Sequence, residues 1–130
     1  MEKNKKHTNA KQVIVEYVEA CRVGSVDRLR AIFHPSALMS GYYQGEFYRG
    51  SPDLFFDEVK DNPSPSETGQ TYSGEITPVG ECGDCASVTL KETGYLGCNF
   101  TNWFHLAYVD GSWVILSKTY SDQQAVRGSA

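Results

Sequence analysis

The side chains of this sequence that could carry acid–base chemistry are few. Of its three histidines, His34 stands within the stretch AIFHPSALMSGYYQGEFYRG, directly before Pro35. An imidazole there could act as a general base, because histidine is the side chain that most often fills this role in enzymes. The alternative is a structural histidine, held beside the proline with its ring bonded to a backbone carbonyl. Glu46 is the single carboxylate of that stretch, so no acid close in sequence is placed to orient the ring.

Cys82 and Cys85 form the sharpest motif of the chain, Cys-Gly-Asp-Cys. Such a pair is either redox-active or half of a zinc site. A thioredoxin-type pair opens a helix, whereas Gly83-Asp84 is typical of a two-residue turn between strands. A zinc site needs two more ligands, and the remaining cysteines are scattered. We therefore expect free thiols at the end of a hairpin, with a disulfide as the alternative, and neither a metal site nor a cofactor.

The composition limits the class of protein. The chain has 130 residues, 40% of them hydrophobic and 22% charged, which fits one globular domain with its own core. The net charge is −4 and the N-terminal lysines form only a short basic arm, so nucleic acid is not an expected partner. No apolar run is long enough to span a bilayer, and residues 1–11 lack the apolar stretch of a signal peptide. We therefore expect a cytoplasmic protein without a membrane partner.

Periodicity predicts a helical first half and a second half made of strands. Apolar residues at helical spacing favour helices over 10–23 and 25–34 and a short third helix that starts at 51–53. His34 is predicted to end the second helix, because a residue before proline is pushed out of the helical region. Residues 61–66 are predicted to be a linker. Turn signals separate strands predicted over 37–43, 46–48, 71–80, 85–95, 99–109 and 113–120.

The strand predicted over 99–109 is apolar or aromatic on both of its faces. One face carries Phe100, Phe104, Leu106 and Tyr108, and the other carries Trp103, His105, Ala107 and Val109. An antiparallel sheet with only one covered face would alternate with polar residues, so the second face also needs a cover. The helices can cover only one side. We therefore predict a homodimer through the sheet, with Trp103, His105 and Ala107 on the dimer face.

The chain resembles the nuclear transport factor 2-like superfamily, and within it the SnoaL-like and lumazine-binding-like proteins. The matching segments are LRAIFHPSALMSGYYQG, DCASVTL and NFTNWFHLAYVDGSWVILSKTY. The resemblance implies a cone-shaped α+β fold of the cystatin-like kind, in which three N-terminal helices pack on a strongly curved antiparallel sheet with a mixed edge. It covers residues 10–121, which leaves residues 1–9 as a flexible arm and 122–130 as a tail. It also implies dimers through the convex face and a pocket on the concave face.

Tested residue by residue, the resemblance gives no complete catalytic set. Tyr17 falls where ketosteroid isomerases of the superfamily carry an oxyanion tyrosine, but residues 39–41 hold no acid where the carboxylate base is expected. A dehydratase or cyclase would need two histidines, or an aspartate with a histidine, in the pocket. His34 and His105 are instead predicted on opposite sides of the sheet. Lys118, on the last strand, is expected to be solvated or, by the resemblance, to reach the pocket or the dimer seam.

What remains is a cavity rich in aromatic side chains. Its predicted lining is Tyr17, His34, Tyr42, Asn102, Phe104 and Tyr108, although a slip of one residue would turn Tyr43 inward in place of Tyr42. The first hypothesis is a dimeric protein that binds a small hydrophobic or aromatic molecule. The second is a dehydratase, cyclase or isomerase in which His34 acts with Tyr17 or Tyr42. The third is a dimeric interaction module without a ligand.

Overall fold

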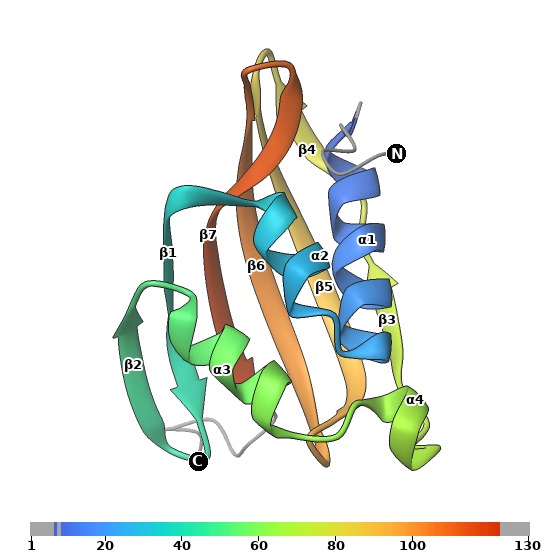
Figure 1. The fold of residues 1–130 in the computed structure, drawn as a ribbon. Helices are drawn as coiled ribbons and strands as arrows, with labels where there is room; N and C mark the ends of the chain where they lie inside the picture. Colours follow the sequence, from blue (N-terminus) through green and yellow to red (C-terminus); the bar gives the residue numbers. More distant parts are fainter. Residues whose placement is uncertain (1–6, 8, 123–130) are drawn as a thin grey trace.

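The computed structural model describes residue 7 and residues 9–122. The helices of this part of the chain are α1 (Ala10–Val23), α2 (Val26–Ile32), α3 (Asp53–Asp61) and α4 (Pro65–Thr68). Its strands are β1 (Phe33–Tyr43), β2 (Glu46–Gly50), β3 (Ser73–Ile76), β4 (Gly80–Cys82), β5 (Cys85–Tyr95), β6 (Cys98–Val109) and β7 (Ser112–Asp122). The helices gather on one side of the sheet (Figure 1). This is the predicted α+β architecture.

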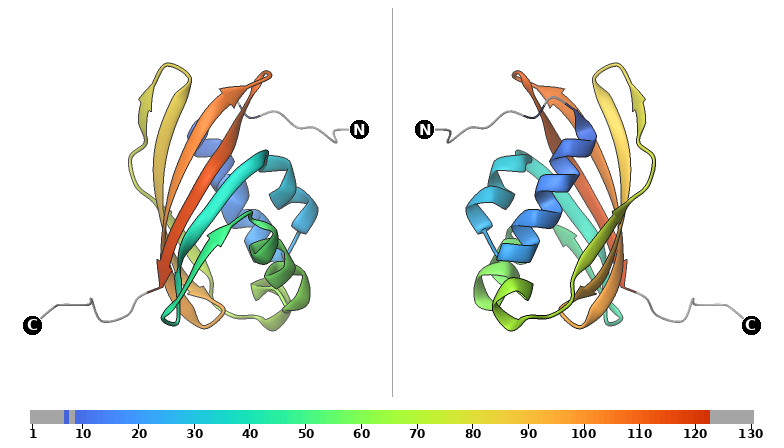
Figure 2. Two further views of the ribbon diagram at one scale, coloured as in Figure 1. Left: turned by 90° about the vertical axis from the view of Figure 1, so that its left-hand side faces the viewer. Right: turned by 90° about the vertical axis from the view of Figure 1, so that its right-hand side faces the viewer.

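The strands form one mixed sheet in the order β2-β1-β7-β6-β5-β3, with β4 also paired to β5. β1 runs parallel to β7, and the other neighbouring strands are antiparallel. Figure 2 shows the sheet curling around the helices. Register shifts between Glu92 and Tyr95 and between His105 and Leu106 contribute to this curvature, because a bulge bends and twists its strand. The predicted curved sheet with a mixed edge is confirmed.

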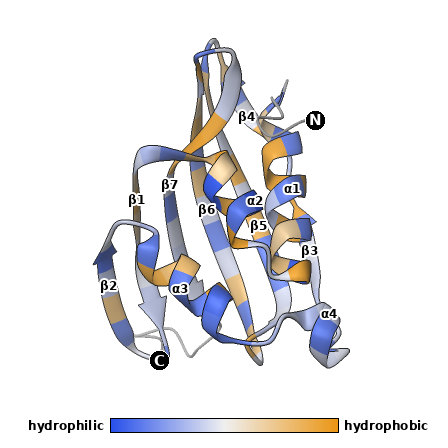
Figure 3. Ribbon diagram, viewed as in Figure 1, coloured by the Kyte–Doolittle hydropathy of each residue, from blue (hydrophilic) through white to orange (hydrophobic). Residues whose placement is uncertain are grey.

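α1 is the helix that fills the concave side of the sheet. Asn9 Oδ1 accepts a hydrogen bond from the backbone N–H of Gln12 (2.8 Å), and Gly24 ends the helix with a φ of 71°. Ile14 and Tyr17 lie at the centre of the core. Figure 3 shows apolar and polar residues interleaved along α1, as expected of a helix that covers a sheet with one of its faces.

The end of the second helix differs from the prediction. α2 ends at Ile32 rather than at His34, because Phe33 already has an extended backbone and pairs with Ile115 of β7. His34 therefore lies inside β1 and not at a helix exit. Pro35 keeps the backbone of His34 out of the helical region, as predicted. The extended backbone at His34 is part of a strand, however, and does not mark the end of a helix.

Two other predictions were wrong. The linker predicted over 61–66 contains the start of α4, which begins with a capping box between Ser64 and Glu67. This short helix packs against α1, which holds it in place. The strand predicted over 71–80 is split into β3 and β4, and both pair with β5.

The side of the sheet that faces away from the helices carries the residues predicted for a dimer. Trp103 and His105 are exposed there, and Ala107 is half-buried. Leu38, on β1, is also exposed. It lies level with His105 across the sheet, since both residues are register partners of Ser117 on β7. The homodimer through this surface stays a prediction.

The structure describes only part of the segments predicted to flank the domain. In the arm predicted over 1–9, His7 is buried: its backbone N–H donates to Ser112 Oγ (2.9 Å), and its carbonyl accepts from the backbone N–H of Trp113 (3.2 Å). Apart from Asp122, the tail predicted over 122–130 lies outside the described residues. Within the described part of the chain, no helix has the length and apolar character needed to cross a membrane.

Candidate functional site

A cavity of about 230 Å³ lies between the helices and the sheet. It is bounded by α1 and α3, by the β1–β2 hairpin and by strands β5, β6 and β7. Most of its wall is aromatic or aliphatic, with a few polar and charged side chains among them. The lining residues are Tyr17, Met39, Tyr43, Gln44, Glu46, Tyr48, Leu54, Phe55, Glu58, Glu92, Tyr95, Leu96, Phe100, Asn102, Lys118 and Tyr120.

Glu92 is a buried carboxylate in this wall, with 4% of its surface exposed. Its Oε2 accepts a hydrogen bond from the hydroxyl of Tyr72 (2.5 Å), and its Oε1 accepts one from the Asn102 side-chain amide (2.8 Å). Hydrogen bonds to a charged acceptor are stronger than those between neutral groups, so two donors stabilise the carboxylate and fix its direction. Glu92 is therefore an oriented acceptor at the edge of the cavity.

Lys118 is the second buried charged group of the wall, with 6% of its surface exposed. Its Nζ lies 3.6 Å from the ring centroid of Phe55, 5.3 Å from that of Tyr17 and 5.4 Å from that of Tyr120. Among the described residues, no carboxylate oxygen lies within 4.0 Å of this nitrogen. Burial lowers the pKa of Lys118, and the nearby Glu92, Cys21 and Glu58 only partly oppose that change.

Tyr17 connects the cavity to the hydrophobic core. Its ring stacks on Phe55 with 5.7 Å between centroids and meets the ring of Phe104 edge-on at 5.0 Å. Burial raises the pKa of Tyr17 well above its ordinary value, so its hydroxyl remains protonated at neutral pH. Burial also raises the pKa of Glu58, on α3, and Lys118 opposes this shift. The cavity wall thus combines the neutral hydroxyl of Tyr17 with the carboxyl groups of Glu46, Glu58 and Glu92 and the amine of Lys118.

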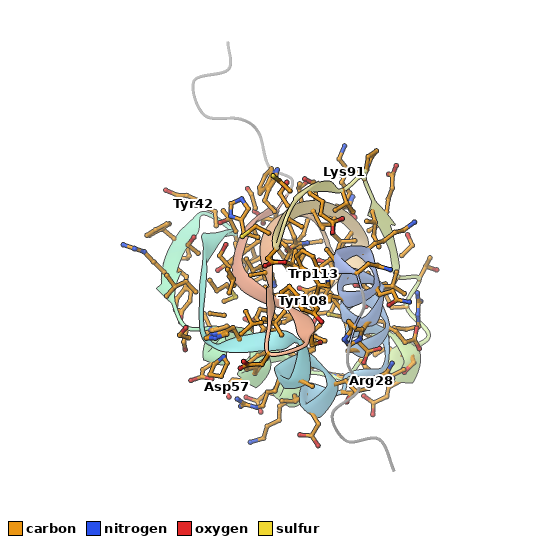
Figure 4. All side chains as sticks on the ribbon, turned by 90° about the horizontal axis from the view of Figure 1, so that it is seen from above. Arg28, Tyr42, Asp57, Lys91, Tyr108 and Trp113 are labelled. Carbon is orange, nitrogen blue, oxygen red and sulfur yellow. The ribbon has the colours of Figure 1, made fainter. Side chains whose placement is uncertain are left out.

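The structure brings some of the predicted pocket residues together. Tyr17 and Asn102 line the cavity, and Phe104 is buried beneath it against Tyr17. On β1 the cavity side carries Met39 and Tyr43, while Tyr42 points outward and packs on Phe47 with 5.3 Å between ring centroids. The register therefore selects Tyr43 in place of Tyr42, and Figure 4 shows Tyr42 at the outside of the molecule.

Two other residues predicted to line the pocket lie away from it. Tyr108 is on the inner side of β6 but near its end, where it is 46% exposed and packs on Trp113 with 5.9 Å between ring centroids (Figure 4). His34 lies near the start of β1, far along the strand from Tyr43, and its Nδ1 accepts a hydrogen bond from the backbone N–H of Ser36 (3.0 Å). Neither residue lines the cavity that contains Glu92 and Lys118.

The remaining histidine and cysteine candidates also lie outside the cavity. His105 is exposed, with its Nδ1 3.4 Å from Ser117 Oγ. Cys82 and Cys85 are register partners across a two-residue turn, and both are exposed free thiols. Cys21 is a buried free thiol in α1. In the part of the chain that the structure describes, no three histidine, cysteine or acidic side chains are grouped as metal ligands.

Lys118 yields a stability prediction. A buried lysine whose folded-state pKa is lowered destabilises the fold where it is protonated, and this cost disappears as the pH rises from the folded pKa to its ordinary value of 10.5. Lys118→Met should therefore be more stable than wild type at pH 7, by on the order of 1 kcal/mol. In urea unfolding the advantage should shrink toward pH 10, whereas the exposed Lys91→Met should show no such trend. A less stable Lys118→Met protein at pH 7 would contradict the prediction.

Comparisons with known proteins agree with the fold and place the chain among relatives. It is similar to the aldolase FrzH of Cladobotryum sp., with 30% identity over 105 residues that cover 80% of this chain and 81% of that protein. It is also similar to the solved structure of an NTF2-like protein of unknown function from Silicibacter pomeroyi DSS-3. That match has 28% identity, a TM-score of 0.76 and coverage of 87% of this chain and 92% of the other.

Two further structures share the fold. An NTF2-like protein of unknown function from Methylobacillus flagellatus KT matches with a TM-score of 0.80, 22% identity and coverage of 88% and 89% of the two chains. A protein with a cystatin-like fold from Nostoc punctiforme PCC 73102 matches with a TM-score of 0.65, 10% identity and coverage of 90% of each chain. Residues 5–121 match the family described as "Putative lumazine-binding". The chain belongs to this family, within the NTF2-like superfamily.

Proposed function

We propose that this protein binds a compact, mainly apolar small molecule in the cavity between α1, α3 and the sheet. The observation that carries the proposal is the cavity itself, whose walls are mostly aromatic and whose charged groups are few. Ligand sites in proteins are typically concave and apolar, with a small number of polar groups that fix the orientation of the ligand. Aromatic walls favour flat or cyclic molecules.

The polar groups define what the ligand should carry. Asn102 and Glu92 lie on neighbouring strands and are joined by a hydrogen bond, while Lys118 reaches the same space from β7. A ligand with one carbonyl or hydroxyl oxygen could accept a hydrogen bond from the lysine and leave its apolar part against the rings. The volume of about 230 Å³ lies below the roughly 300–1,000 Å³ of ligand pockets in general, which favours a compact molecule.

A second candidate function is an enzyme that acts on a carbonyl compound. It is favoured by Glu92 and Lys118, a buried carboxylate and a buried amine that line one cavity. Enolisation and aldol chemistry need a base that removes a proton next to a carbonyl and a group that stabilises the resulting charge. The similar protein from Cladobotryum sp. is named an aldolase. The geometry offers no such support for a reaction at His34, which lies outside the cavity.

Blocking the cavity tests the binding proposal. Leu54, on α3, lines the cavity and is partly exposed, so Leu54→Trp should fill the space without disturbing the core. A panel of flat heterocycles and cyclic ketones is screened by ligand-observed NMR. We expect at least one compound to bind, and Leu54→Trp to weaken it by about tenfold or more. Val15→Trp, at an exposed site on α1, serves as the matched control and should bind like wild type.

The result also separates the binding proposal from the interaction module without a ligand. That module requires no compound of the panel to bind, or binding that Leu54→Trp leaves unchanged. Either result would overturn the proposal: in the first no compound occupies the cavity, and in the second the compound binds at another site.

A further inference from the structure

Lys118 is a primary amine in an unusual position. Its aliphatic stem extends from β7 into the cavity wall, and its Nζ ends between the rings of Phe55, Tyr17 and Tyr120. Most lysines keep the ammonium group in water, and a fully buried one is rare unless it is paired. Lys118 has no ion pair with the described residues and is nevertheless almost completely buried. A methionine would fill the same space without the cost of burying a charge.

Titratable groups on three different elements act on the charge of Lys118. Glu92 on β5, Glu58 on α3 and Cys21 on α1 each favour the ammonium form, yet burial outweighs them and lowers the pKa of the lysine. Burial raises the pKa of Cys21, so this residue remains a thiol and does not compete as a nucleophile. Compared with a lysine on the surface, a larger fraction of Lys118 is therefore the neutral amine at neutral pH.

We propose that Lys118 is a covalent site: its Nζ forms an imine with the carbonyl carbon of a ketone or aldehyde bound in the cavity. A desolvated lysine in an apolar pocket is the form in which this side chain acts as a nucleophile toward carbonyl groups. The inference rests on the proposed function, because the carbonyl compound must first occupy the cavity. It adds a covalent intermediate and names the atom that reacts.

The step balances with the groups present. The Nζ lone pair forms a bond to the carbonyl carbon, and the two hydrogens of the amine leave with the carbonyl oxygen as water. This gives a neutral imine, which one proton converts to an iminium ion. The carboxylate of Glu92, held by Tyr72 and Asn102, is a base in the same cavity that can take a proton from the carbon next to the iminium. Loss of that proton gives an enamine, which is the carbon nucleophile of an aldol reaction.

Borohydride trapping tests the inference on the intact chain. The protein is incubated with cyclohexanone, a compact cyclic ketone, at pH 7, and borohydride is added to transfer a hydride to the imine carbon. The product is a stable secondary amine that carries one cyclohexyl group, which peptide mapping by mass spectrometry assigns to a lysine. We expect labelling of Lys118 to be at least about tenfold faster than labelling of Lys91, an exposed lysine that lies at the outside of the molecule (Figure 4).

The controls separate a built site from general lysine reactivity. Lys118→Arg keeps the charge but cannot form an imine, so fast labelling should disappear, while Lys91→Arg should retain it. The preference for Lys118 should also vanish in urea, where the cavity is lost; circular dichroism checks that both variants are folded. Equal labelling of all lysines in the folded protein would overturn the inference.

Failure of the inference can be told apart from failure of the proposed function. If ligand-observed NMR detects cyclohexanone in the cavity but borohydride does not label Lys118, the imine is disproved and the binding function stands. If neither cyclohexanone nor any compound of the panel binds and no labelling occurs, both are disproved.

Discussion

A Glu92→Gln variant should exchange the α-hydrogens of cyclohexanone for deuterium about 100-fold more slowly than wild type, or slower still. The carboxylate of Glu92 lines the same cavity as Lys118 and is positioned by hydrogen bonds from Tyr72 and Asn102. If a ketone is held there, Glu92 is the oriented base that can accept a proton from the carbon next to the carbonyl. A glutamine has nearly the same shape but cannot accept that proton. Proton NMR in deuterated buffer measures the exchange rate directly.

The comparison with a control variant isolates the base. Glu81→Gln, at an exposed site on β4, removes the same charge outside the cavity and should exchange at the wild-type rate. In Glu92→Gln, borohydride labelling of Lys118 should persist, because imine formation needs the amine and not this carboxylate. Unchanged exchange in Glu92→Gln would show that the carboxylate is not the base. Absence of exchange in wild type would overturn the enzyme as the second candidate function.

Glu92 illustrates how much of the site the sequence could have predicted. The inward-facing residues of β5 are Ala86, Val88, Leu90 and Glu92, and the strand alternates without a break over this stretch. Glu92 therefore occupies the next inward-facing position after three apolar residues, and the alternation of the strand alone predicts that its side chain is buried. A glutamate in a strand is usually solvated, so its chemical type suggested the opposite side. Of the two residues that stabilise it, Asn102 lies 10 residues away on the paired strand β6, and Tyr72 lies 20 residues away, just before β3.

The side of the sheet that Lys118 faces does not follow from the sequence, because a bulge lies between Lys118 and the start of its strand. Trp113 and Ile115 face inward in β7, and strict alternation from them would turn Lys118 outward. Leu116 is an extra residue opposite β6, since Leu106 pairs with Ile115 and His105 with Ser117. That extra residue reverses which side of the sheet the following side chains face, so Lys118 points inward. Nothing local in the sequence marks the position of the bulge.

Two other predicted pocket residues, Tyr42 on β1 and Tyr108 on β6, lie away from the cavity for different reasons. Which of Tyr42 and Tyr43 faces inward depends on the register of β1, and pairing with β2 and β7 fixes that register. Tyr108 has the predicted phase, but the helices do not cover the end of its strand, so it is exposed. The helices α1, α2 and α3 and the turns between the strands were predictable, because caps, turns and periodicity are local signals.

Gly41→Ala should destabilise the protein by about 3 kcal/mol or more, which would unfold a large fraction of it under mild denaturing conditions. A Cβ at this position would lie 2.0 Å from the carbonyl oxygen of Tyr120 and 2.8 Å from the ring of the same residue. The obstacle is backbone of the neighbouring strand, so it cannot rotate away as a flexible side chain could. Relief requires β1 and β7 to separate where Gly41 and Tyr120 are register partners, beside the wall of the cavity.

Gly45→Ala is the matched control, because it separates the close contact from the effect of backbone conformation. Gly45 has a φ of 83°, but no atom outside its immediate neighbours lies within 4 Å of its added Cβ, so the substitution should cost only about 1 kcal/mol. Urea unfolding followed by circular dichroism measures both variants. Because β1 and β7 carry Met39, Lys118 and Tyr120 into the cavity, Gly41→Ala should also weaken ligand binding even where the protein is still folded. Equal and small losses in the two variants would mean that the β1–β7 pairing can yield, and that it does not hold the cavity wall in place.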